Sequence, residues 1–382
     1  MKDISIYFTP VVLDEFKFEE DQIGSKIIIN QIDFPEIKKN SCVIFSVPEF
    51  RGNHISLTNK VNSKFRNDLY KHYFGGEWIF NIYDLGEILP GKELTDTYYA
   101  VTNVVAELVK VGAIPIIIGG SQDLIFSVYK GYEKLEQLIN ICSIDHALDL
   151  GEPSAEVKSN GYLSQILLNR PCYLFNHATI GLQIPYVNPK QLELFDKLYF
   201  DICRLGEFNS SFTKAEPHLR NADIINIDFE SIKASEVLNN QAIPNGFYAQ
   251  QICQIAKYAG ISDKSTTFGI FNYYKSNDVS DQLLAQIIWY FLDGVGSRKG
   301  DFPIGSKTDY TKFRVFQEES NNELIFYKSN KSERWWLEVP YPPSEGKKYE
   351  RHYIIPCNKE DYDNAMKNEI PDLWWKTYQK LG

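Results

Sequence analysis

The sequence predicts an α/β fold in which a doubly wound, mainly parallel sheet lies between two layers of helices. Strand-like segments that are apolar at nearly every position recur along the chain, as in parallel sheets that helices cover on both faces. Segments with helical spacing of apolar residues alternate with these strands over roughly 250 residues. This alternation is typical of doubly wound sheets.

The stretch from Ile114 to Gly151 shows this pattern most clearly, because it contains a strand, a turn, a helix and a second strand. The first strand ends in the Gly119-Gly120 turn, and the second ends in the polar segment 143–149. In open parallel sheets, ligands bind beyond the carboxyl ends of the strands. The sequence therefore predicts a site at this edge.

Further strands and helices are predicted on either side of this stretch. Runs of β-branched and aromatic residues predict strands at residues 41–48, 78–82, 178–182, 197–202, 223–230 and 266–272. Helical periodicity, or entry through Pro and Gly, predicts helices at residues 64–74, 94–111, 162–168, 247–259 and 279–292.

Length and composition predict an α/β domain at residues 1–300 and a C-terminal extension at residues 301–382 that packs on it. The chain has 382 residues, above the ~250–300 at which single cores stop growing. The extension is expected to hold a short β segment, at residues 324–328 and 334–339, and then two short helices.

The extension is rich in aromatic residues and proline. Its notable residues are the pairs Trp335-Trp336 and Trp374-Trp375 and the prolines Pro340, Pro342 and Pro343. The aromatic residues either cover a bare face of the α/β domain or form a docking surface for a protein partner, since aromatic anchors are enriched at interface hot spots.

Charge and cysteine content exclude several classes of protein. The net charge of −10 disfavours nucleic-acid binding, which needs clustered Lys and Arg. No apolar run reaches the ~18–20 residues of a membrane span, and the first residues lack the pattern of a secretory signal. The six cysteines are scattered singly, without a CxxC motif. We therefore expect reduced thiols and a cytoplasmic protein.

Acidic residues gather at the ends of two predicted strands. Asp145 and Asp149 follow the second strand of the central stretch, whereas Asp228 and Glu230 stand two apart at the end of residues 223–230 and so share one side. Four carboxylates in one crevice repel one another unless protons or a cation compensate. Oxygen ligands of this kind suit Mg, Ca or Mn.

These segments resemble the motifs of the arginase (ureohydrolase) superfamily, most closely its formimidoylglutamase branch. The matching segments are Gly119-Gly120-Ser121-Gln122, Asp145-His146-Ala147-Leu148-Asp149, residues 226–234 and Pro244-Asn245-Gly246. The resemblance covers about residues 40–297 and implies the three-layer αβα arginase-like fold. It also implies a binuclear manganese centre that activates a hydroxide to attack a guanidino or formimidoyl carbon.

The resemblance implies a metal site that this chain keeps only in part. Its carboxylate ligands are matched by Asp145, Asp149, Asp228 and Glu230. The two imidazole positions carry Gln122, which offers only a neutral carbonyl oxygen, and Ala147, which offers nothing. His146 is one place from the expected histidine. On an extended backbone it would point away from the aspartates, and in a loop it could turn back and bind a metal, so both alternatives remain open.

Two other family features are missing. The glutamate that binds the cationic nitrogen of the substrate is matched by Asn272, which supplies no negative charge. The loop at residues 151–162 contains no histidine, whereas arginases use one there as a proton shuttle. Asn272 is therefore the candidate substrate-binding residue, and no catalytic residue is assigned.

Three functions remain open at this stage. The first is a non-catalytic pseudoenzyme that binds a partner or assembles with other proteins, with no cofactor or with a single divalent cation. The second is a hydrolase of linear amidines whose altered centre binds a manganese pair with the help of His146 or Gln122. The third is metal-free carboxylate chemistry or ligand sensing. The Trp-rich extension as a partner surface, a small amidine ligand and a homo-oligomer are further expectations.

Overall fold

The structure is a computed structural model with all side chains. It describes residues 3–12, 17–53, 64–76, 78–152, 157–238, 242–274, 277–303, 306–317, 322–341 and 352–382. Pro342, Pro343 and part of the loop that lacks histidine, residues 153–156, lie outside the described residues.

A ten-stranded sheet forms the centre of the molecule, in the order β1-β4-β3-β5-β10-β9-β6-β7-β8, with β2 beside β4. The strands are β1 (Phe8–Thr9), β2 (Ile28–Ile29), β3 (Cys42–Val47), β4 (Ile82–Ile88), β5 (Ile114–Gly119), β6 (Ile139–Ile144), β7 (Leu174–Leu182), β8 (Asp201–Arg204), β9 (Ile224–Asp228) and β10 (Thr267–Phe271). Only the β1–β4 pairing is antiparallel among these described strands. The predicted mainly parallel sheet is confirmed.

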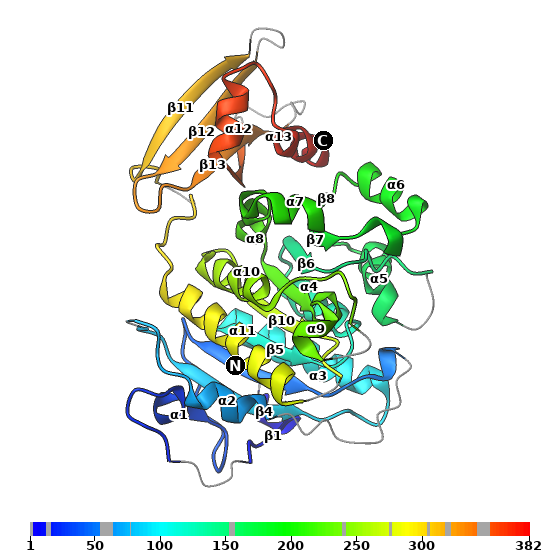
Figure 1. The fold of residues 1–382 in the computed structure, drawn as a ribbon, viewed down its shortest axis with the longest axis vertical. Coiled ribbons are helices and arrows are strands. Elements are labelled where there is room, and N and C mark those ends of the chain that lie inside the picture. Colours follow the sequence, from blue (N-terminus) through cyan, green and yellow to red (C-terminus); the bar gives the residue numbers. More distant parts are fainter. Residues whose placement is uncertain are drawn as a thin grey trace.

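Helices cover both faces of this sheet (Figure 1). One face carries α2 (Phe65–Lys71), α10 (Ala249–Ile261) and α11 (Asp278–Gly296), and the other carries α3 (Leu94–Lys110), α4 (Leu124–Glu133) and α5 (Tyr162–Leu168). Alternate residues of one strand therefore enter different cores: Ile44 of β3 packs in the first core and Phe45 in the second. This explains why the central strands are apolar at every position.

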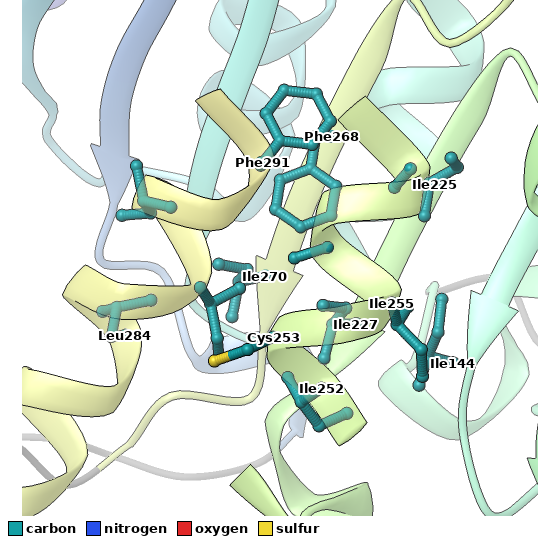
Figure 2. Packing of buried hydrophobic residues seen from close by; sticks show 14 of the residues in the cluster. Ile144, Ile225, Ile227, Ile252, Cys253, Ile255, Phe268, Ile270, Leu284 and Phe291 are labelled. Atoms are coloured by element: carbon teal, nitrogen blue, oxygen red, sulfur yellow. The ribbon is translucent and has the colours of Figure 1, made fainter. Parts of the chain in front are cut away.

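The core beneath α10 and α11 is built from strand isoleucines and helix side chains (Figure 2). Phe268 of β10 stacks on Phe291 of α11, with ring centroids 4.2 Å apart. Ile255 of α10 lies beside Ile227 of β9 and Ile144 of β6 in the same core. This packing holds β9 and β10 rigidly, and their carboxyl ends carry part of the candidate site.

Some predicted boundaries were wrong. The strand predicted at residues 78–82 lies later, as β4, and the segment predicted as strand 197–202 begins as a helix. Short apolar runs do not distinguish a strand from a short helix, so such errors are expected. Five short helices were not predicted, namely α1 (Ile23–Lys26), α6 (Pro189–Lys197), α7 (Leu205–Ser210), α8 (Glu216–Asn221) and α9 (Ala234–Val237).

The C-terminal extension forms a second, antiparallel sheet beyond α7 and α8, at the top of Figure 1. Its four strands are β11 (Tyr310–Gln317), β12 (Asn322–Ser329), β13 (Trp335–Pro340) and β14 (His352–Cys357), followed by α12 (Lys359–Ala365) and α13 (Asp372–Leu381). The two predicted helices are present, but the predicted short β segment was incomplete because β11 and β14 were missed.

Most of the tryptophans in the extension are buried. Trp335 and Trp374 belong to a core that the extension forms for itself, and Trp336 is 1% exposed and packs on Arg220 of α8. Only Trp375, at 52% exposure, offers a large aromatic surface among these four. The interpretation as a mere cover of the α/β domain was therefore incomplete, and a partner surface at this segment stays a prediction.

Arg220 joins the extension to the α/β domain. Its guanidinium donates hydrogen bonds to the carbonyl oxygens of Trp335 and Cys357, both at 2.9 Å, and pairs with both carboxylate oxygens of Glu216. The side chain is 4% exposed. Because a buried guanidinium needs all these partners, it fixes the two sheets relative to each other.

The described helices include none that combines the length and the apolar composition needed to cross a membrane.

Candidate metal centre

Four neighbouring strands bring the predicted site residues together. The order β5-β10-β9-β6 places the carboxyl ends of these strands side by side. Gln122 follows β5, Asn272 follows β10, Asp228 ends β9 and Asp145 follows β6. Although β5 and β6 are consecutive in the chain, two other strands lie between them, and such crossovers create a crevice at the strand ends. The structure brings these residues together: Gln122 contacts Asp145 directly, and Asn272 contacts both Gln122 and Asp228.

The side chains of Gln122 and Asn272 form what we name the amide clasp. Gln122 Nε2 donates a hydrogen bond to Asp145 Oδ2 at 2.6 Å. Asn272 Nδ2 lies 2.9 Å from Asp228 Oδ1 and 3.1 Å from Gln122 Oε1 and donates to both. Each aspartate therefore receives an amide N–H from the protein itself.

The direction of the amide clasp is fixed by the backbone. The N–H of Gln122 donates to Asn272 Oδ1 at 3.1 Å, and a backbone N–H can only donate. The carbonyl end of Asn272 must therefore face Gln122 N, and its NH₂ end must face Asp228 and Gln122 Oε1. As Gln122 Oε1 then accepts, Gln122 Nε2 is the end that faces Asp145.

Loop residues that sequence reasoning missed hold Asn272 in place. Tyr274 donates its hydroxyl hydrogen to Asn272 Oδ1 at 2.6 Å and itself accepts a short hydrogen bond from Asn53 Nδ2. Ser159 Oγ accepts from the backbone N–H of Gln122 at 3.0 Å. Asn272 adopts a left-handed backbone with φ 59°, which Asn tolerates better than most residues. No motif in the sequence signals these contacts, because they come from distant loops.

His146 turns toward the carboxylates. Its Nδ1 lies 3.2 Å from Asp145 Oδ1 and 3.7 Å from Asp228 Oδ2. Of the two alternatives left open for His146, the structure shows the loop geometry, because β6 ends at Ile144 and the chain bends at His146. The edge of the Tyr186 ring packs against the imidazole, with centroids 5.0 Å apart. Whether His146 binds a metal stays a prediction.

The cluster compensates its negative charge with protons and with His146. Burial raises the pKa of Asp228 well above its ordinary value, and the charges of Asp145 and Glu230 add to the rise. Burial likewise raises the pKa of Asp149, together with the charges of Asp145 and Asp228. Although burial disfavours a charged imidazole, the three acidic neighbours raise the pKa of His146 to about 9.

Asp145 is the carboxylate that stays ionised. Burial favours its neutral form, but His146, the Gln122 amide and the backbone N–H of Ala147 hold the pKa of Asp145 below its ordinary value. The positive charge of His146 offsets the negative charge of Asp145, and the raised pKa values of Asp149 and Asp228 favour their neutral forms. Repulsion between the carboxylates is thus relieved by groups of the chain.

Asp149 and Glu230 lie at the border of the cluster. Asp149 has φ 49° and hydrogen-bonds Asp145. Burial raises the pKa of Glu230 to about 7, while His146 opposes the rise. Among the described residues, the group whose donor atoms all lie within 4.8 Å of one another consists of Asp145, His146 and Asp228. The predicted roles of Asp149 and Glu230 as metal ligands stay untested.

The residues do not fit a manganese pair. The resemblance implies imidazole ligands at two positions that in this chain hold Gln122, whose NH₂ end faces Asp145, and Ala147. The Oδ1 of Asp228 already accepts hydrogen bonds from Asn272 and from the backbone N–H of Glu230 at 3.0 Å. Two cations would have to displace these N–H groups. The Asp145, His146 and Asp228 group fits one divalent cation, because carboxylates and a neutral imidazole are accepted ligands.

A second buried network lies one layer deeper in the sheet. Ser143 Oγ contacts His177 Nε2 at 3.2 Å and the Tyr162 hydroxyl at 3.0 Å, and it accepts from Asn226 Nδ2 at 3.0 Å. Burial lowers the pKa of His177 to about 3, so this imidazole is neutral. Sequence reasoning missed His177, since a single histidine in an apolar strand carries no signal of its own.

Comparison with known proteins rests on structure. No known family profile and no curated protein sequence matches the chain. A formiminoglutamase from Trypanosoma cruzi with Mn²⁺ matches at 16% identity and a TM-score of 0.62, over 73% of this chain and 99% of the other. A formimidoylglutamase from Bacillus subtilis matches at 15% identity and a TM-score of 0.62, over 75% and 95%. An arginase from Bacillus cereus matches at 12% identity and a TM-score of 0.53, over 66% and 98%.

Nearly the whole length of each of these structures aligns with this chain. About a quarter of the chain lies outside the match with the two formimidoylglutamases. The mostly parallel sheet, the helices on both faces and the convergence of acidic strand ends agree with the resemblance seen in the sequence. The chain therefore has the fold that these formimidoylglutamase and arginase structures share.

Proposed function

We propose that this chain is a non-catalytic protein on the arginase-superfamily fold, a pseudoenzyme that serves as a binding or assembly module. The observation that carries the proposal is the hydrogen bond from Gln122 Nε2 to Asp145 Oδ2 at 2.6 Å. An N–H group cannot coordinate a cation. At a position where the resemblance implies an imidazole ligand, this chain presents a hydrogen-bond donor.

The state of the cluster supports the same proposal. Asp228 Oδ1 accepts hydrogen bonds from Asn272 Nδ2 and from the backbone N–H of Glu230, so this carboxylate oxygen already has donors from the chain. His146 lies beside Asp145 and Asp228 and supplies positive charge there. Asn272, at the position where the resemblance implies a substrate-binding glutamate, directs its amide into the cluster and supplies no negative charge.

A second candidate is a metal-dependent hydrolase of linear amidines with an altered centre, and one observation favours it. His146 Nδ1 is buried and makes no well-directed hydrogen bond to any described residue. With a neutral ring, its lone pair could join Asp145 and Asp228 around a single cation. A bound divalent cation would supply Lewis-acid activation of water. In this chain, Asp145 and Asp228 would then orient that water.

Metal analysis together with an activity assay separates the two candidates. The purified protein is dialysed against manganese, its metal content is measured, and release of urea or formamide is followed with arginine, agmatine, guanidinobutyrate and formimidoylglutamate. We expect less than one manganese per chain and no turnover with any of the four. Two bound manganese ions with turnover would overturn the proposal, and one ion with turnover that Asp228→Asn abolishes would establish the second candidate.

Restoring the missing imidazoles tests the placement of the motifs. The variant Gln122→His, His146→Ala, Ala147→His should bind manganese at least ~10-fold more tightly than the unchanged chain, because the ligand set is completed and the amide clasp is opened. His146→Ala alone is the matched control and should not gain affinity. If the triple variant folds and gains none, the correspondence of these three positions is incorrect.

A further inference from the structure

A cavity lies at the end of the central sheet where the strands begin, opposite the candidate metal centre. Its volume is about 460 Å³, and its walls come from the starts of β7 and β8, from α8, and from β14, α12 and α13 of the extension. Asp201, which lines it, is the first residue of β8, whereas the candidate metal centre follows the last residues of β6 and β9. A volume of this size is typical of small-molecule sites.

Cationic groups converge on one carboxylate in this cavity. Lys376 Nζ lies 3.5 Å and His218 Nδ1 lies 3.9 Å from the carboxylate of Asp201. Asn176 Nδ2 donates to Asp201 Oδ2 at 3.0 Å, and Lys380 Nζ donates to Asn176 Oδ1 at 2.5 Å. Lys376 thus lies beside Asp201 directly, and Lys380 is connected to it through Asn176. Burial lowers the pKa of His218, so the two lysines are the cationic groups here.

The two lysines use only some of their N–H donors in hydrogen bonds within the protein. An ammonium has three N–H donors, yet among the described residues Lys380 Nζ has one acceptor, Asn176, and Lys376 Nζ has two, Phe200 O and Asp201. Both side chains line the cavity. Burial lowers the pKa of Lys380 to about 8, with Asp201 opposing the shift and Lys376 adding to it. An anion between the two lysines would relieve this penalty.

We propose that this cavity binds a small molecule through one oxyanion, a carboxylate or a phosphate group, which Lys376 and Lys380 hold between them. Phe175, Ile355 and Leu373 add an apolar wall for the rest of the molecule. Glu360, Glu369 and Asp372 are exposed where they line the cavity. These acids repel polyanions, so the ligand carries a single anionic head.

The proposal does not depend on the candidate metal centre, since none of the residues of that cluster lines this cavity. The two proposals can therefore fail separately. Asp145→Asn, which alters the metal-centre cluster, should leave anion binding in this cavity unchanged.

Titration of the full chain with two probes tests the proposal. Sodium phosphate and sodium butyrate are added separately, and binding is followed by calorimetry and by the ring resonances of His218. We expect one site of millimolar or better affinity for at least one probe, and the stronger probe identifies the head group as phosphate or carboxylate. If neither probe binds or shifts His218, the proposal is overturned.

Lysine variants locate the site. Lys376→Gln with Lys380→Gln should weaken binding about tenfold or more, the loss expected for charge-assisted hydrogen bonds. Lys367→Gln is the matched control, because Lys367 is exposed and outside the cavity. Unchanged binding in a folded double variant would overturn the proposal. Where the double variant fails to fold, Lys376→Gln alone and the His218 shift in the unaltered chain decide.

Discussion

The two edges of the central sheet differ in how their charges are neutralised. At the carboxyl edge, Asp145 and Asp228 accept hydrogen bonds from the side-chain amides of Gln122 and Asn272, and the His146 imidazole lies beside both carboxylates. At the amino edge, Lys376 contacts Asp201 and Lys380 contacts Asn176 beside a cavity of about 460 Å³. The two aspartates thus have donors within the chain, whereas the two lysines keep N–H groups for which the described residues show no acceptor.

This difference teaches that the position of a cluster in a fold does not decide whether it binds a ligand. The carboxyl edge is where open α/β sheets bind their ligands, and chemistry-bearing residues do gather there. Their lone pairs are nevertheless occupied by amide and backbone N–H groups. A ligand site requires unsatisfied groups beside accessible space, and in this chain the amino edge meets that condition more fully.

The largest expected effect on the free energy of unfolding comes from removing Arg220, which joins the extension to the α/β domain. Arg220→Ala removes the buried bridge to Trp335, Cys357 and Glu216 and should lower the free energy of unfolding by about 3–5 kcal/mol. Urea unfolding measures this loss. Arg314→Ala, at an exposed ion pair, is the matched control and should cost below about 1 kcal/mol. Equal losses in the two variants would mean that Arg220 does not join the sheets.

A smaller loss is expected from opening the carboxyl edge. Gln122→Ala removes the donor to Asp145 and the acceptor for Asn272, and leaving such buried groups unpaired should cost about 1–3 kcal/mol. Gln250→Ala changes an exposed residue of α10 and serves as the control. The amide clasp has no structural role if both variants unfold at the same urea concentration.

The layer beneath the carboxyl edge should make stability depend on pH. His177 is neutral when folded because burial lowers its pKa to about 3, whereas an unfolded histidine titrates near its ordinary pKa of 6.5. Between these pH values the unfolded chain binds a proton that the folded chain does not, so stability falls as the pH is lowered, by up to about 1.4 kcal/mol per pH unit. His177→Phe should flatten this acid limb in urea unfolding at several pH values. An unchanged slope would show that His177 is protonated in the folded chain.

The smallest effect is expected at the exposed tryptophan of the extension. Trp375→Ala should change the free energy of unfolding by less than about 0.5 kcal/mol, because the side chain is 52% exposed. Trp374→Ala, one residue earlier and 6% exposed, should cost about 3–5 kcal/mol. Thermal unfolding of both variants compares them. A large loss in Trp375→Ala would place that ring in the core and remove the last tryptophan of the two pairs from any partner surface.

Sequence reasoning predicted the strands that are buried on both faces, because nearly all their residues are apolar. The apolar runs of β5 and β6 are buried on both faces, so these strands can be recognised from their own residues alone. The helices α7 and α8 have only six residues each, less than two helical turns, so they show no repeated apolar spacing. β14 follows a proline-rich stretch. These elements depend on tertiary contacts.

The same distinction applies to the candidate site. The identities of Gln122, Asp145 and Asp228 could be read from the order of motifs. The direction of His146 could not, because it depends on the bend after Ile144, and the roles of Ser159 and Tyr274 depend on loops that meet only in the folded chain. Motif matching therefore located the cluster but not its hydrogen bonds.

The central claim is that hydrogen bonds, and not a manganese pair, hold the carboxyl edge together. Crystals grown with excess manganese chloride and measured for anomalous scattering at the manganese edge test it most directly. We expect Gln122 Nε2 to remain on Asp145 and no pair of anomalous peaks beside Asp145 and Asp228. Two ordered peaks bridged by these aspartates, with the Gln122 side chain displaced, would contradict the account.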